Sequence, residues 1–407
     1  MFRSFFPKPQ LFLLTAFIWA LACILFWYLV AAEWSEPLGV ANLLGVEDRA
    51  VWLYQFVISC YAIFALTWLR FAPHEWGQWS VFGTVAIIFV TWFQVQIDVS
   101  INDWYGDFYN IVQSALNEPG SITPSEYYAS IATFLKLAMI AITVHVLTNF
   151  GVKHYVFRWR TAMNNHYMEI WDKVRHIEGA SQRIQEDCMR FAELMERIGK
   201  RTVDAMMTLV AFLPLLWVLS DNIPEIPIIG ELPKALVWIA VIWSLFGTGL
   251  LALVGIRLPG LEFRNQRVEA AYRKELVLGE DDAARAQPPT WRELFQHVRK
   301  NYFRLYFNYM YFDVFRYGYL QFGVMVPMLA MGPSIIAGSL TFGLWRQILN
   351  AFDRVESSIQ FLVHSWTSIV ELMSIYKRLR AFEAAIAGDE QAAIEFEAGG
   401  MTRPAGE

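Results

Sequence analysis

Residues 11–31 read LFLLTAFIWALACILFWYLVA, a run without a single charged side chain. The hydrocarbon core of a bilayer is about 30 Å thick and needs about 20 predominantly apolar residues as a helix. The run is longer than the apolar core of a secretory signal peptide, which has about 7–15 residues. Trp27 and Tyr28, near its end, suit the aromatic belt of a membrane interface. The run therefore predicts a membrane-spanning helix that is retained in the protein.

Further apolar runs extend this pattern along the chain, at 51–71, 80–100, 128–150, 203–219 and 235–256. A last stretch, 311–349, is too long for one span and contains Gly332-Pro333. Proline lacks a backbone donor and disfavours helical backbone in the preceding residue, so we expect a tight turn there. The sequence thus predicts an all-α polytopic membrane protein with about eight transmembrane helices.

The composition agrees with this class. The 407 residues are 56% hydrophobic and only 17% charged, whereas a soluble domain has about 25% charged residues. The three cysteines have no CxxC spacing, and the seven histidines form no HExxH or paired-ligand pattern. We therefore expect no disulfide framework, no metal, no cofactor and no nucleic-acid partner.

The loop charges predict the orientation of the spans. Lysine and arginine concentrate in cytoplasmic loops, and they are abundant in 151–201 and 257–304 but absent from 101–127 and 221–233. The acidic 32–50 loop is expected outside, and Arg346, Arg354 and the charges of 377–380 are expected inside. This alternation places both termini in the cytoplasm.

The long charged segments are predicted to be helices. Residues 160–202 contain no proline, and 257–287 continue as helix until Gln287-Pro288-Pro289-Thr290, where Thr290 is expected to cap the next helix. Six long helices with two intracellular helical turns are the arrangement of ATP-binding-cassette exporters. The expected domains are a two-helix membrane segment (1–79), an exporter-like six-helix domain (80–380) and a flexible cytoplasmic tail (381–407).

Several strings resemble the SbmA/BacA family of bacterial inner-membrane peptide-uptake transporters. They are MFRSFFPKP (1–9), HYVFRWRTAMN (154–164), HIEGA (176–180), LPGLEFRNQRVEAAYRKEL (258–276), GEDD (279–282) and ELMSIYKRLR (371–380). The resemblance implies a homodimeric importer that is driven by the proton gradient and contacts membrane lipids. It also implies antimicrobial peptides and glycopeptide antibiotics as substrates, and a link of BacA-like members to very-long-chain fatty acids of the envelope.

The absence of a nucleotide-binding motif limits the possible energy sources for transport. It has no GxxxxGK[ST] motif, and the tail after 380 is too short to hide a nucleotide-binding domain. Uphill transport would therefore use an ion gradient or a partner subunit. No nucleophile triad is found, so we do not expect an enzyme.

Carboxylates at helical spacing are the candidates for proton coupling. Glu262, Glu269 and Glu280 lie within about 20° of one stripe that is roughly 27 Å long. On the preceding long helix Glu186, Glu193 and Asp204 align, with Glu196 beside them. Facing stripes would form a ladder of acids. The proposed coupling residues, at which the family resemblance also points, are Glu196, Glu269 and Glu280, with Glu193 and Glu275 in support.

A plainer interpretation of both stripes is available. Each contains a base, Lys200 or Arg273, and charged stripes on cytoplasmic helices are usually solvated faces or structural salt bridges.

Acidic and aromatic side chains in the predicted outer loop are candidates for substrate binding. Asp103, Trp104, Asp107 and Tyr109 could attract cationic peptides without reading their sequence. Outer loops are poor in lysine and arginine in any case, so the acidity alone is weak support.

Two other functions are consistent with the sequence. The chain could be a permease subunit that uses a separate ATPase, or a protein that acts on envelope lipids. The first would bind a nucleotide-binding partner, and the second would need an acid/base pair or a nucleophile near the interface.

Overall fold

The computed structural model describes residues 1–31, 48–175, 177, 180–223, 225–227, 230–282 and 284–387. The described chain is helical apart from a two-residue antiparallel pair, β1 (Glu225–Ile226) with β2 (Gly230–Glu231). It divides into two compact units. Most of the predicted outer loop 32–50 and the end of the predicted tail, 388–407, lie outside the described residues.

Unit 1 comprises Met1–Ile97, Lys136–Asp204 and Glu371–Glu407. Its elements, some of which continue beyond the unit, are α1 (Pro9–Leu29), α2 (Asp48–Phe71), η3 (Gln78–Gly83), α3 (Thr84–Asn117), α4 (Pro124–Glu169), α5 (Trp171–Val174), α6 (Ala180–Gln182), η4 (Arg183–Asp187), α7 (Cys188–Leu219) and α13 (Trp366–Ile386). The first helix begins with Pro9 in its first turn, where a missing N–H costs nothing. Its exposed side chains are almost all apolar, as a lipid-facing helix requires.

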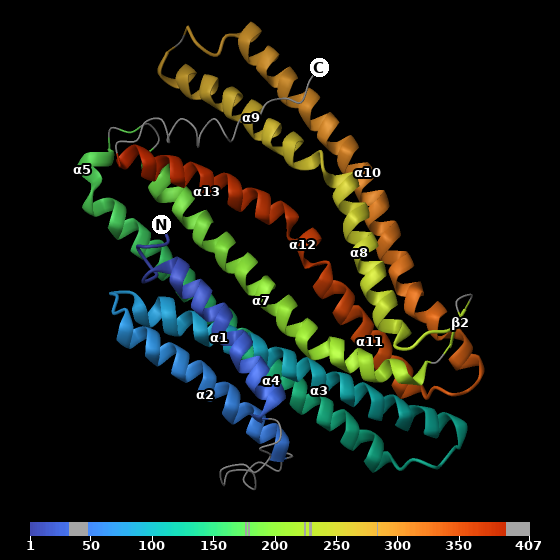
Figure 1. Ribbon diagram of the computed structural model, residues 1–407. Helices are drawn as coiled ribbons and strands as arrows, with labels where there is room; N and C mark the ends of the chain where they lie inside the picture. Colours follow the sequence, from blue (N-terminus) through green and yellow to red (C-terminus); the bar gives the residue numbers. More distant parts are fainter. Residues whose placement is uncertain are drawn as a thin grey trace. The chain divides into compact units, whose positions relative to one another are not determined.

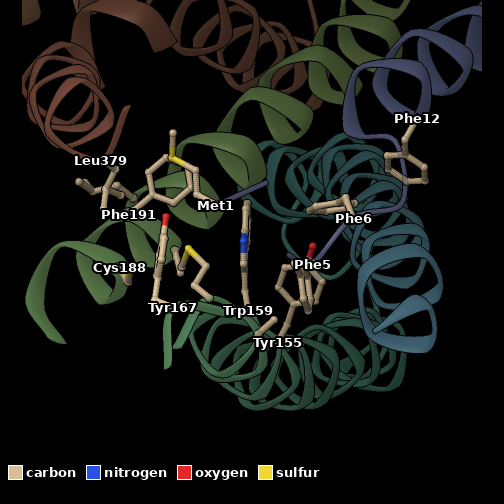
Figure 2. Close-up of a cluster of buried hydrophobic side chains, with 14 of the residues drawn as sticks. Met1, Phe5, Phe6, Phe12, Tyr155, Trp159, Tyr167, Cys188, Phe191 and Leu379 are labelled. Atoms are coloured by element: carbon tan, nitrogen blue, oxygen red, sulfur yellow. The ribbon is translucent and has the colours of Figure 1, made fainter. Parts of the chain in front are cut away.

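The core of unit 1 is an aromatic cluster that joins residues far apart in the sequence (Figure 2). Phe5 is fully buried and stacks on Trp159 of α4, with the ring centroids 5.5 Å apart. Phe191 of α7 meets the same Trp159 ring edge-on at 5.8 Å, and Tyr155 meets Phe5 edge-on at 5.3 Å. Such pairs add about 0.5–1.5 kcal/mol each beyond the area they bury. The segment before α1 is therefore packed onto α4 and α7.

A buried carboxylate fastens α13 to the start of α7. Asp187 is only 2% exposed and accepts two hydrogen bonds from Arg378, at 2.7 and 3.1 Å. Arg183 donates a third at 3.1 Å. The burial of this charge is thus compensated by two guanidinium groups.

Unit 2 comprises Asp98–Leu135 and Ala205–Val370. Besides parts of α3, α4, α7 and α13 it holds the short pair of strands and η5 (Ser220–Asn222), α8 (Ala235–Gly255), α9 (Leu258–Asp281), α10 (Pro288–Ile336), α11 (Phe342–Ile359) and α12 (Phe361–His364). The long α10 runs beside α9 and then α8, and α11 packs on α8 (Figure 1). Thr290, the predicted cap of α10, lies within its first turn instead. The helix begins at Pro288 because proline at that position needs no hydrogen-bond donor.

Seven helical stretches of the described chain are long and apolar enough to cross a membrane. They are Pro9–Leu29, Trp52–Phe71, Gln78–Asn117, Pro124–Glu169, Ala180–Asn222, Ala235–Glu262 and Pro288–Ile336, and each overlaps one of the first seven predicted spans. The position predicted for the turn after the seventh span, at Gly332-Pro333, needs correction. Pro333 stays inside α10, the chain turns at Gly338 with φ +70°, and α11 begins at Phe342 with four charged residues.

A seam of polar contacts joins α11 to the C-terminal half of α3. Arg354 pairs with Asp98 at 3.0 Å, and Asn350 donates to Asn102 at 2.8 Å. At the other end of the seam, Asn110 accepts from the backbone N–H of Gly343 at 3.0 Å.

The seam brings together residues for which the loop charges predict opposite sides of the membrane. Arg346, predicted on the cytoplasmic side, lies 5.1 Å from the ring of Tyr105 in the predicted outer segment, and Arg354 pairs with Asp98, so the two predicted sides do not agree with each other. The late turn at Gly338 places both arginines within α11, where α3 supplies their partners. The outer segment itself is mostly helix, because α3 continues to Asn117.

We expect Gly343→Ala to destabilise this seam. A β-carbon at Gly343 would collide with the carbonyl oxygen of Gly106, so α3 and α11 would have to move apart. Forcing an extra methyl group into a packed contact costs about 1–3 kcal/mol. The measurement is the temperature of unfolding in detergent. Gly332→Ala is the control, since nothing lies within 4 Å of its β-carbon. Equal unfolding temperatures for the two variants would contradict the close approach.

Candidate functional site

Glu269 is the predicted coupling residue that the structure places at a cavity. It is half-buried on α9 and borders a space of about 360 Å³ within unit 2. The rest of the lining comes from α10 and is mainly aromatic: Phe295, Val298, Arg299, Tyr302, Phe303 and Tyr306. Phe295, Arg299, Phe303 and Tyr306 are exposed, so the space is open to the surface of unit 2.

The orientation of Glu269 follows from the way α9 packs on α10. Asn301 of α10 donates a hydrogen bond to Asn265 of α9 at 3.3 Å, and both asparagines are buried. Leu261, one turn before Asn265, is buried as well. Residues four apart share a helix face, so Glu269 lies on the face that Leu261 and Asn265 turn toward α10. A buried amide pair of this kind fixes the register of two helices.

The other two predicted residues of α9 have different surroundings. Glu275 accepts a hydrogen bond from the backbone N–H of Ala286 at 3.1 Å and pairs with Arg285 at 3.5 Å. It thereby closes the turn between α9 and α10, which is the structural salt bridge that the plainer interpretation named. Glu280 is exposed. Their part in coupling stays a prediction.

In unit 1, Glu196 is half-buried on the polar part of α7, before the apolar stretch 203–219. Burial raises the pKa of its carboxyl group, while the positive charges of Lys200 and Arg197 act in the opposite direction. Glu196 is close enough to Tyr155 of α4 to interact with it electrostatically. Tyr155 in turn shares a hydrogen bond with Thr84 at 2.8 Å. Glu193, one turn earlier, is exposed.

The two predicted stripes fall in different units, Glu193 and Glu196 in unit 1 and the α9 carboxylates in unit 2. Their facing as a ladder stays a prediction. In unit 1 the π-helical turn η4 holds Glu186, which pairs with Arg190 at 2.8 Å. That part of the stripe is a surface ion pair.

The four predicted substrate-binding residues lie on one stretch of α3. Asp103 and Asp107 are exposed one turn apart, so their charges act together. Trp104 instead packs between Phe108 and Phe134, both at 4.6 Å, and donates to the carbonyl of Ser130 at 2.8 Å. Tyr109 meets Phe342 of α11 edge-on at 5.0 Å. In this structure Trp104 and Tyr109 pack α3 against neighbouring helices, whereas Asp103 and Asp107 are exposed.

Sequence reasoning did not find the polar seam or the buried Glu356 of α11. The available signal was the spacing of polar residues along α3, at 98, 102, 110 and 113, which recur every three, four or eight residues on one helix face. Among the described residues, no three histidine, cysteine or acidic side chains gather as a metal site would require.

The long apolar helices define a multi-pass helical membrane protein. The chain belongs to the SbmA/BacA-like family, whose model matches residues 73–387. It is a membrane transporter related to ABC transporter proteins.

Three relatives illustrate this relationship. The Escherichia coli (strain K12) inner membrane ABC transporter ATP-binding protein YddA is 22% identical over 338 residues, 77% of this chain and 58% of that protein. An uncharacterized ABC transporter ATP-binding protein of Synechocystis is 20% identical over 371 residues, 86% of this chain and 52% of that protein. ABC transporter D family member 2, chloroplastic, of Arabidopsis thaliana is 21% identical over 315 residues, 73% of this chain and 42% of that protein. The chain spans about half the length of the curated relatives it matches.

Proposed function

We propose that this chain imports peptides, including antimicrobial peptides and glycopeptide antibiotics, across a bacterial inner membrane as a homodimer driven by the proton gradient. In this proposal both termini are cytoplasmic, residues 80–380 form the transport domain, and 1–79 are an added two-helix segment. The observation that carries the proposal is Glu269, a half-buried carboxylate that borders an aromatic-lined cavity. Membership of the SbmA/BacA-like family supports a transporter, and the carboxylate supplies the group that a proton can occupy.

The physical mechanism is a change of charge. An ionised carboxylate is favoured when the cavity is hydrated, and the neutral acid is favoured when the cavity closes and water leaves. Glu269 and Glu196 thus bind protons in one state and release them in another. One charge that crosses a potential of about 100 mV releases about 2.3 kcal/mol. Since 1.36 kcal/mol corresponds to a factor of ten, one proton per peptide supports about a fiftyfold accumulation.

The entry side of the proposal rests on Asp103 and Asp107. Exposed carboxylates one turn apart on α3 raise the local concentration of cationic peptides, and this effect weakens as salt screens it. It requires no fixed peptide sequence, which suits a transporter of varied substrates.

The decisive experiment uses the purified full chain in sealed proteoliposomes without ATP. We expect a labelled proline-rich antimicrobial peptide to accumulate when the outside is made acidic, and a proton ionophore to stop it. Empty liposomes provide the background. Accumulation that ignores the pH gradient would contradict proton coupling.

A permease that uses a separate ATPase is the second candidate, because the curated relatives carry ATP-binding in their names and are longer than this chain, which covers 58% and 52% of two of them. It predicts no accumulation in the ATP-free liposomes. It also predicts that a nucleotide-binding protein purifies with this chain and that ATP restores uptake.

A further inference from the structure

A second buried carboxylate lies in unit 2, away from the cavity at Glu269. Glu356 of α11 is 9% exposed. It contacts Tyr319 of α10 and Gln360, the residue that follows α11, and Trp243 of α8 stacks on Tyr319. Its Oε1 accepts a hydrogen bond from the Tyr319 hydroxyl and another from the Gln360 amide, both at 2.9 Å. Tyr319 and Gln360 are 3% and 2% exposed. Three helices thus converge on one carboxyl group.

Two glycines allow this convergence. A β-carbon on Gly247 of α8 would collide with the Tyr319 ring, which stacks on Trp243 with the centroids 5.0 Å apart. A β-carbon on Gly323 of α10 would come within 3.2 Å of Glu356 Oε1. Gly247 and Gly323 have no side chain, so α8 and α10 can pack closely against Tyr319 and the carboxyl group of Glu356.

Among the described residues, no cation pairs with Glu356. Arg354, two residues earlier, is bonded to Asp98, and Asp353 is an exposed carboxylate. Of the helices packed around it, α10 contributes Tyr319 and α8 contributes Trp243, which does not titrate. A buried ion without a partner costs several kcal/mol, whereas a neutral carboxylic acid does not.

The hydrogen bonds can satisfy the carboxyl group in either protonation state. The Tyr319 hydroxyl has two acceptors in reach, Glu356 Oε1 at 2.9 Å and the Trp243 carbonyl oxygen at 3.3 Å. When Glu356 is ionised, the hydroxyl donates to it. When Glu356 is protonated, its own O–H can donate to the tyrosine oxygen, and the tyrosine hydrogen turns to Trp243. Gln360 donates to the cluster throughout, because its amide contacts both Glu356 and Tyr319.

We propose that Glu356 is a further proton-binding group of this transporter, set among the apolar helices of unit 2, with the Tyr319 hydroxyl as the donor that switches between the two states. The proton is taken up from water as an O–H bond of the carboxyl group and is returned to water when that bond breaks. The role in transport rests on the proposed proton coupling, but the binding of a proton does not. Glu356 lies on α11 and is hydrogen-bonded to Tyr319 and Gln360, whereas the carboxylates of the predicted ladder lie on α7 and α9.

Infrared difference spectroscopy of the reconstituted full chain tests proton binding directly. As the pH is lowered, the carbonyl stretch of a protonated carboxyl group should grow in the wild type, and Glu356→Gln should remove that part of it. Tyr319→Phe should shift the frequency of the band because a hydrogen bond to the carboxyl group is lost. Asp353→Asn, which removes an exposed carboxylate three residues away, should leave the band in place. A wild-type-minus-Glu356→Gln spectrum that does not change with pH overturns the proposal.

Transport assays test the coupling role. Glu356→Gln should keep peptide exchange between equal concentrations, which requires a folded protein, and should lose the accumulation that a pH gradient drives. Full accumulation in this variant overturns the role in transport. If the wild type itself fails to use a pH gradient, the proposed function fails while the infrared result still decides whether Glu356 binds a proton.

Discussion

In the Glu269→Gln variant we expect peptide uptake to be abolished while the protein is made and folded normally. Glutamine keeps the shape and the hydrogen bonds of the side chain but can neither hold a negative charge nor release a proton. The change occurs at the cavity between α9 and α10, where the buried Asn265–Asn301 pair still fixes the helices. Uptake into proteoliposomes under an imposed pH gradient is the measurement, with size-exclusion profile and unfolding temperature as the checks of folding.

Glu293→Gln is the matched control for this prediction. Glu293 is exposed on α10, so its loss removes one carboxylate of the same chemistry without touching the cavity. We expect unchanged uptake in the control. Undiminished uptake in Glu269→Gln would remove Glu269 from the mechanism.

The second large effect is expected for Arg378→Ala. This change removes two charge-assisted hydrogen bonds from the buried carboxylate of Asp187. Among the described residues, Arg183 then remains as its cationic partner, at 3.1 Å. Taking one partner from a buried ion pair costs about 3–5 kcal/mol, and since Arg183 remains we expect about 3 kcal/mol. Chemical unfolding in detergent, compared with the wild type, measures this difference.

Arg190→Ala provides the comparison for the buried pair. Arg190 pairs with Glu186 at 2.8 Å, but both side chains are about half exposed. Pairs of this kind contribute about 0–1 kcal/mol because water solvates both charges in either case. A loss for Arg378→Ala no larger than that for Arg190→Ala would show that Asp187 is not held as a buried charge.

Much of the fold could be predicted because membrane spans depend on local composition. The seven confirmed spans and the helix over most of 257–287 follow from apolar length and helical periodicity. The turn before α11 did not follow, because proline is tolerated inside membrane helices when neighbours satisfy the freed carbonyl groups, and both Pro327 and Pro333 lie within α10. The cytoplasmic side predicted for Arg346 and Arg354 depended on the same turn.

The candidate site was less predictable because it depends on contacts between distant residues. The spacing of the carboxylates predicted that Glu269 lies on a helix, but only the packing of α10 shows that it borders the cavity. Glu275 on the same helix instead pairs with Arg285 and accepts a hydrogen bond from the backbone N–H of Ala286. The cluster at Glu356 draws on residues 243, 319 and 356, which no pattern in the sequence connects. From the sequence alone, a glutamate in a helix with other charged residues is expected to be exposed to solvent, and only its packing shows that Glu356 is buried.

The aromatic core of unit 1 has a consequence for biogenesis. Trp159 packs on Phe5 and Phe191, and the same core also contains Leu379 and Phe382 of α13. A ribosome adds about 5–20 residues per second, so the interval between the synthesis of Trp159 and of α13 is on the order of tens of seconds. During that time the core lacks Leu379 and Phe382, so the packing of unit 1 is complete only after α13 has been synthesised.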